Sequence, residues 1–232
     1  MTRAISGQFR QAAFSVLRNR FSTLSRSWFI GLGLVGAAIA VGVIAWSGQV
    51  MTLPIACVFP TLWAFAPKRL MAAMVSVAYF LAASRDLPQG ASTYLEIGLI
   101  ESAGLWFAAS GSFVFVHTLL WTSKPGWQRA ARYGIATILM GLPPFGIIGW
   151  AGPITAVGVL FPGWGWAGLA ATATGLLVMT TRAWPLAALA LGSAWAWSAA
   201  AWDPTAPAAP QTRRGSSGHR GSPPPCHRKD AG

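Results

Sequence analysis

Charged residues are scarce in this chain, and acidic residues are the scarcest. Asp and Glu together number five among 232 residues. All charged residues make up 9% of the chain, whereas a soluble domain carries about 25%. So few charges cannot cover a globular surface with polar groups, which argues against a self-contained soluble enzyme. Because 54% of the residues are hydrophobic, a lipid bilayer is the expected surrounding.

Residues that ligate metals or form disulfides are also few. Cys57 lies in an apolar run and Cys226 in a polar tail, so a disulfide framework is not expected. His117, His219 and His227 are scattered, without the spacing of a metal site. Paired carboxylates, a nucleophile elbow and a phosphate-binding loop are missing as well. The sequence therefore predicts no catalytic residue, no metal and no cofactor.

Long apolar runs dominate what is present, and they predict an all-α, polytopic transmembrane bundle over residues 28–202. The first run begins at Trp28 and is about 20 residues long, which is too long for a cleavable signal peptide. A bilayer core needs about 20 apolar residues per helix, which gives about seven spans with the N-terminus in the cytoplasm. The predicted spans are roughly 28–47, 50–66, 70–83, 97–121, 133–150, 154–180 and 183–201.

Lys and Arg residues in the short loops predict the orientation. Loops on one side hold eleven of them and loops on the other side hold one, Arg85, so the richer side is cytoplasmic. The eleven are Arg3, Arg10, Arg18, Arg20, Arg26, Lys68, Arg69, Lys124, Arg129, Arg132 and Arg182. The net charge of +12 is thus expected to face lipid headgroups, and no direct nucleic-acid partner is expected. The basic leader, residues 1–27, is either a helix on the cytoplasmic membrane surface or a solvated segment.

A few polar or aromatic residues are candidates for function. Glu101 is the acid within a predicted span, and it either serves a function there or reaches the outer interface. Arg85 and Asp86 open the outer loop SRDLPQGAS, where they either shape a site or belong to a plain turn. Trp164 and Trp166 lie in the Gly-rich string FPGWGWAGL, which either packs closely against other helices or breaks the sixth span.

Three further features in the spans are expected to be structural. Pro143 and Pro144 remove helix hydrogen bonds and must kink or break the fifth span. His117, near the cytoplasmic end of the fourth span, is expected to have a structural role. Ala38 and Gly42, four residues apart, are a weak signal of close helix packing.

Three stretches together resemble the TraB family of conjugal transfer proteins from transmissible bacterial plasmids. They are YFLAASRDLPQG (79–90), GLPPFGIIGWAGPITAVGVLFPGWGWAGLAATA (141–173) and MTTRAWPLAALALG (179–192), and the resemblance covers most of residues 48–202. It implies a multi-pass protein of the bacterial inner membrane whose partners are the bilayer and other proteins of the conjugation machinery. The resemblance does not point to an enzyme active in this chain alone.

The TraB family is similar in layout to apolipoprotein N-acyltransferase, in which membrane helices precede a nitrilase-like domain with a Glu–Lys–Cys type of triad. The implied alternative function is therefore the membrane half of such an enzyme, inactive alone. A small permease is the third reading. No catalytic residue carries over to this chain, because Cys226 follows three prolines in a segment without strands.

The tail, residues 203–232, departs from that layout. From Pro204 onward it holds no Leu, Ile, Val, Phe or Met, so we expect it to be disordered. Its Arg, Pro, Gly, Ser, Ala and His content is typical of GC-rich DNA read out of frame. A frameshift near residues 205–215 that truncates a longer protein is one hypothesis, and a genuine short tail is the other. Sequencing the downstream DNA for a long open frame separates them.

The charge count makes a direct prediction about topology. Reporter fusions after Arg69 and Arg129 are expected to report from the cytoplasm, and a fusion after Gln89 from the opposite side. Alkaline phosphatase and a fluorescent protein form the matched pair of reporters, because each is active on one side alone. A cytoplasmic Gln89 would overturn the seven-span arrangement.

Overall fold

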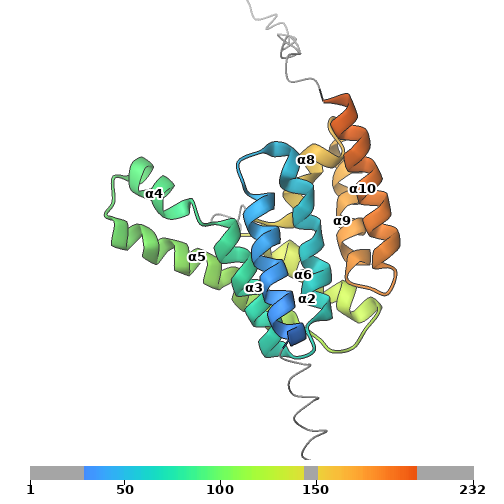
Figure 1. The fold of residues 1–232 in the computed structure, drawn as a ribbon, viewed down its shortest axis with the longest axis horizontal. Helices are drawn as coiled ribbons and strands as arrows, with labels where there is room; N and C mark the ends of the chain where they lie inside the picture. Colours follow the sequence, from blue (N-terminus) through green and yellow to red (C-terminus); the bar gives the residue numbers. More distant parts are fainter. Residues whose placement is uncertain (1–28, 144–150, 203–232) are drawn as a thin grey trace, which may run out of the picture. The chain divides into compact units, whose positions relative to one another are not determined.

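A computed structural model describes residues 29–143 and 151–202, and every regular element in these ranges is helical (Figure 1). The all-α class is therefore confirmed for this part of the chain. The leader, the tail and Pro144 lie outside the described residues, as does the rest of 144–150. The elements are the helix Phe29–Ala45, η1 (Val50–Val58), α2 (Phe59–Phe65), α3 (Arg69–Ala83), α4 (Leu87–Leu95), α5 (Leu99–Leu120), α6 (Trp127–Gly141), η2 (Pro153–Ala156), α8 (Val157–Leu160), α9 (Gly165–Met179) and α10 (Trp184–Ala201).

The helix Phe29–Ala45 packs against α3 through small residues. A Cβ atom added at Gly31 would meet the Met71 side chain, and one added at Gly42 would meet Tyr79 and Ala83. From Gly31 to Gly42 the contacted residues advance from Met71 to Ala83, so these two helices run parallel. The weak packing signal at Gly42 therefore marks a real close approach between helices.

Aromatic rings form the centre of the core. Phe59, where η1 passes into α2, stacks on Tyr79 of α3 with ring centroids 4.3 Å apart. Phe80 stacks on Phe113 of α5 at 4.9 Å. The His117 imidazole lies among these rings and is 3% exposed, which agrees with the structural role expected for it.

The remaining helices pack around this core or extend from it. α9 and α10 pack against each other, and α9 also contacts α6 and η1. α5 packs along α3 at its C-terminal end, whereas α4 lies along the start of α5. In Figure 1 α4 and the first half of α5 extend to the left, away from the other helices.

Helix lengths bear on the predicted membrane spans. Leu99–Leu120 has 22 residues and is about 33 Å long at 1.5 Å per residue, enough for a bilayer core of about 30 Å. By length and hydropathy it is the one described helix that is long and apolar enough to cross a membrane by itself, and a second candidate arises if α3 and α4, bent by 48°, form one span. The other apolar helices are shorter, so seven spans remain a prediction.

The outer loop contains a helix as well as a turn. α4 begins directly after Asp86 and has Pro88 in its first turn. A proline is tolerated there because its missing N–H would have no partner inside the helix. The helix ends at Glu96, whose left-handed backbone (φ 54°) stops the hydrogen-bond ladder. Arg85 and Asp86 thus lie in a turn, whereas residues 87–92 of the predicted loop are helical.

Proline and glycine interrupt two of the predicted spans. α6 ends at Gly141, just before Pro143, so the proline pair follows a helix end. In the predicted sixth span, α8 ends at Leu160 and α9 begins at Gly165. Gly163 (φ 80°) and Gly165 (φ 51°) form the break, with backbone angles that other residues adopt at a cost. Of the two readings of FPGWGWAGL, the structure thus has the break.

Gly42 offers a test of the packing. A Cβ there would lie 2.8 Å from the Tyr79 carbonyl oxygen and 3.1 Å from the Ala83 backbone nitrogen, which cannot move aside as a side chain can. We expect Gly42→Ala to destabilise the protein by about 1–3 kcal/mol, measured as thermal unfolding of the full chain in detergent. Gly36→Ala, on the same helix with open space around it, is the control and should not destabilise. Equal effects of the two changes would contradict the close approach.

Candidate functional site

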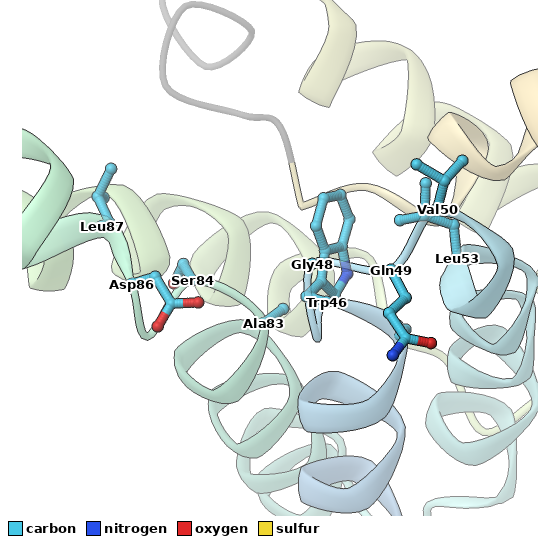
Figure 2. A pocket seen from close by; sticks show the side chains of 10 residues that line it. Trp46, Gly48, Gln49, Val50, Leu53, Ala83, Ser84, Asp86 and Leu87 are labelled. Carbon is cyan, nitrogen blue, oxygen red and sulfur yellow. The ribbon is translucent and has the colours of Figure 1, made fainter. Parts of the chain in front are cut away.

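A hollow of about 380 Å³ lies where the helix Phe29–Ala45 turns into η1 and where α3 ends. Figure 2 shows Ser84, Asp86 and Leu87 on one side of it and Gln49, Val50 and Leu53 on the other. Its walls are mainly apolar, and Gln49, Ser84 and Asp86 supply the polar side chains. We call this the outer hollow, because the charge count predicts that its loops lie outside the cytoplasm.

Arg85 holds one wall of the outer hollow in place. Its guanidinium donates to the carbonyl oxygens of Val43 at 3.1 Å and Trp46 at 3.2 Å, at the end of the first helix. Carbonyls at a helix end lack partners within the helix, and the dipole there favours a cation. Asp86 lies 3.7 Å from Arg85 Nε but is 80% exposed, so this ion pair contributes little to stability.

Ser84 lines the hollow, but its hydroxyl proton is already used in a hydrogen bond within the fold. Its O–H donates to the Phe80 carbonyl at 2.6 Å, and its oxygen accepts from Trp106 Nε1 at 2.9 Å. The Ser110 hydroxyl lies 3.1 Å away, and it is the donor in this pair because the Ser84 proton is already used. Ser84 therefore joins α3 to α5 and is not placed as a nucleophile.

Trp46 connects the hollow to the core. Its indole N–H donates to the Tyr79 hydroxyl at 3.3 Å, and that hydroxyl donates to the Ala151 carbonyl at 3.3 Å. This chain of bonds joins the end of the first helix, the middle of α3 and the segment that leads into η2. A buried hydroxyl needs such partners, because an unpaired one costs about 1–3 kcal/mol.

The other candidate residues lie elsewhere. Glu101 is exposed in the first turn of α5, where a carboxylate favours the helix N-terminus. Its carboxylate folds back toward Gly98. Trp164, 62% exposed, lies in the break between α8 and α9, and Trp166, 85% exposed, lies in the first turn of α9. Neither they nor Glu101 line the outer hollow, so of the five candidates Asp86 lines it and Arg85 lies directly beside it.

Three residues of this site carried no signal in the sequence. Trp46 and Gln49 read as an ordinary span end and loop, and Ser84 as one more small residue in an apolar run. Their joint position depends on how the first helix packs against α3, which is a contact between residues about 40 apart.

The chemistry of the outer hollow suits binding better than catalysis. Its free polar groups are the Gln49 amide and the Asp86 carboxylate, beside apolar walls. Within residues 29–143 and 151–202, no group of three or more His, Cys, Asp or Glu side chains is placed to hold a metal ion. Such a lining recognises a ligand that is partly apolar and carries a few hydrogen-bonding groups.

Similarity to known proteins decides the family. The chain is 48% identical over 221 residues to the conjugal transfer protein TraB of Agrobacterium fabrum, a match that covers 90% of this chain and 52% of that protein. It is 53% identical over 166 residues to a probable conjugal transfer protein TraB of Sinorhizobium fredii, covering 72% of this chain and 43% of that protein. The chain belongs to the TraB family. The resemblance drawn from its Pro, Gly and Trp strings is thereby confirmed.

The match to the TraB proteins covers part of their length. The chain spans about half the length of the relatives it matches. A third relative, an uncharacterized protein outside the virF region of Agrobacterium tumefaciens, is 51% identical over 79 residues. No family model and no solved structure matches the chain. The likeness of layout to apolipoprotein N-acyltransferase stays a prediction, as does the truncation hypothesis.

The role of Arg85 can be tested by stability. Arg85→Gln removes the charged donor from two helix-end carbonyls, and we expect it to destabilise this TraB chain by about 1–2 kcal/mol. Asp86→Asn is the matched control and should cost less than about 1 kcal/mol, because the ion pair is largely solvated. Thermal unfolding of the full chain in detergent measures both. A larger loss for Asp86→Asn than for Arg85→Gln would show that the ion pair, and not the helix-end bonds, holds the loop.

Proposed function

We propose that this TraB chain is an inner-membrane component of plasmid conjugal transfer. The observation that carries the proposal is the identity of about half of all aligned residues to two proteins named for conjugal transfer. The similarity to the A. fabrum protein extends over 90% of this chain. Such a match reaches the loops and termini of helices as well as the apolar runs, so it reflects more than a shared hydrophobic composition.

The helical architecture supports a position in the membrane. Many large apolar side chains are exposed, among them Ile100 at 86%, Leu186 at 69% and Trp197 at 81%. Exposed apolar surface on this scale is costly in water and favourable in lipid. α5 is long enough to cross the bilayer, and we infer that the shorter helices cross with it as a multi-pass bundle of about seven spans.

The orientation follows from the same charge distribution. We infer that the leader, the starts of α3 and α6 with Arg69 and Arg129, and the turn with Arg182 face the cytoplasm. The outer hollow then faces the opposite compartment, where Asp86 and Gln49 are accessible to a partner of the transfer machinery. Residues 1–27, 28–202 and 203–232 act in this proposal as leader, membrane bundle and tail. The bundle is assigned no catalytic step.

Mating assays test the proposal. Deleting the gene from a donor strain should abolish most plasmid transfer, and the wild-type chain supplied in trans should restore it. Asp86→Asn combined with Gln49→Leu removes the negative charge and the side-chain amide of the outer hollow, so we expect reduced transfer at normal membrane abundance. Glu101→Gln is the matched control outside the hollow and should transfer like the wild type, because its side chain is exposed.

Unchanged transfer in the deletion strain would overturn the role in conjugation. Normal transfer by the double variant would instead overturn the assignment of the hollow and leave the role in conjugation intact. Immunoblots of washed membranes accompany each assay, because loss of the protein from the membrane would explain reduced transfer without any role of the hollow.

A further inference from the structure

A second hollow, of about 210 Å³, lies where the end of α2, the loop before α6 and the turn between α9 and α10 meet. We call it the basic hollow. It adjoins another hollow of about 620 Å³, and the two share Pro125, Thr181 and Arg182. Its principal lining residues are Phe65, Pro125, Arg129, Thr181, Arg182 and Trp184.

The basic hollow is lined by two arginines, Arg129 and Arg182, and by no acidic residue of the described ranges. Asp86, Glu96 and Glu101 are the acids within the described ranges, and none lines either of these hollows. The ion pair found in the described part of the chain joins Arg85 to Asp86, far along the sequence from Arg129 and Arg182. Two guanidinium groups facing one hollow repel each other unless an anion lies between them.

Arg129 also has an unused donor. Its Nη2 donates to the Ser123 carbonyl at 3.3 Å, but its buried Nε–H has no hydrogen-bond partner. Partial burial lowers the pKa of this guanidinium, as expected for a cation in a site short of negative charge. A buried donor without an acceptor is costly, so the geometry favours a ligand that brings oxygen atoms.

The hydroxyl groups of Thr180 and Thr181 in the turn are not free to donate to a ligand. Thr180 donates its hydroxyl proton to the Leu177 carbonyl at 2.7 Å, and Thr181 donates to the Val178 carbonyl at 2.8 Å. The Thr181 oxygen also accepts from the Ala183 amide at 3.1 Å. Their hydrogen bonds thus fix the turn, and recognition of a ligand falls to the two guanidinium groups.

The opposite wall of the basic hollow is aromatic. Phe65 and Trp184 meet edge to face with ring centroids 5.9 Å apart, and Phe65 is 51% exposed. Trp127, which lines the adjoining hollow, is 76% exposed. A small soluble anion gains nothing from contact with an aromatic wall, whereas a lipid can pack its glycerol and acyl chains against it. Tryptophan also favours the membrane–water interface, where lipid headgroups lie.

We propose that the basic hollow binds the phosphate headgroup of an anionic phospholipid, with Arg129 and Arg182 as donors and the Phe65–Trp184 pair beside the lipid's glycerol and upper acyl chains. The proposal rests on the membrane location argued above, and not on a role in conjugation. The negative surface of the cytoplasmic leaflet supplies such lipids on the side where these arginines are expected. Guanidinium groups suit this task because they bind phosphate oxygens in pairs.

Binding of phosphatidylglycerol and of phosphatidylcholine to the full-length chain in detergent tests the proposal, with native mass spectrometry as the readout. Phosphatidylglycerol should bind more tightly. Arg129→Gln and Arg182→Gln should each weaken its binding about tenfold, the effect of losing a charge-assisted hydrogen bond. Arg69→Gln removes the same charge from an exposed residue that does not line the hollow, and should leave binding unchanged.

Several results would overturn the proposal. Equal binding of the two lipids would remove the role of headgroup charge. An equal loss in Arg69→Gln would show general attraction by the basic surface in place of a site. Displacement of the lipid by excess inorganic phosphate, or by a short DNA duplex, would assign the hollow to a soluble anion or to nucleic acid. Arg182 is exposed, so its variant keeps the test valid if Arg129→Gln fails to fold. Because binding is measured on the purified chain, a failed mating assay does not affect it.

Discussion

Packing of aromatic rings around the His117 imidazole holds α2, α3, α5 and α6 of this TraB chain together. Trp63 of α2, Phe80 of α3 and Tyr133 of α6 each meet the imidazole at an edge or a tilt. His117 Nδ1 donates to the Phe113 carbonyl at 2.9 Å, and the His117 carbonyl accepts from Trp63 Nε1 at 3.1 Å. A lipid environment offers no hydrophobic drive for helices to associate, so close packing and satisfied polar groups must hold them together. The cluster supplies both to four segments at once.

The two hollows flank this core and differ in charge. The outer hollow contains Asp86 and lies beside an arginine that is already bonded to helix-end carbonyls. The basic hollow contains Arg129 and Arg182 with no acid from the described ranges. The scarcity of acidic residues makes this contrast possible, because a chain with more of them would neutralise its arginines internally. In a membrane, Arg129 and Arg182 would then be available to bind the phosphate of a lipid or another anion.

The family relationship and the geometry support different parts of the functional argument. Similarity to named TraB proteins supports a part in conjugal transfer, and it extends over about half of their length. The hollows come from the packing of this chain alone. Their free polar groups are suited to recognition, since Ser84, Thr180 and Thr181 all use their hydroxyl protons within the fold. Binding to a partner and to lipid are therefore the roles that we propose for the two hollows.

The sequence by itself determined the helical class, the family and most helix boundaries, because apolar runs and turn-forming residues act locally. The helices 29–45, 69–83 and 184–201 lie within two residues of the limits expected for them. Local signals missed the helix Leu87–Leu95, which has Pro88 in its first turn, and they left open whether Gly163 and Gly165 break a span. Only the tertiary structure decided which residues share a site. Arg85 reaches Val43, and Arg129 shares a hollow with Arg182, through contacts between residues about 40 to 50 apart, which no local pattern encodes.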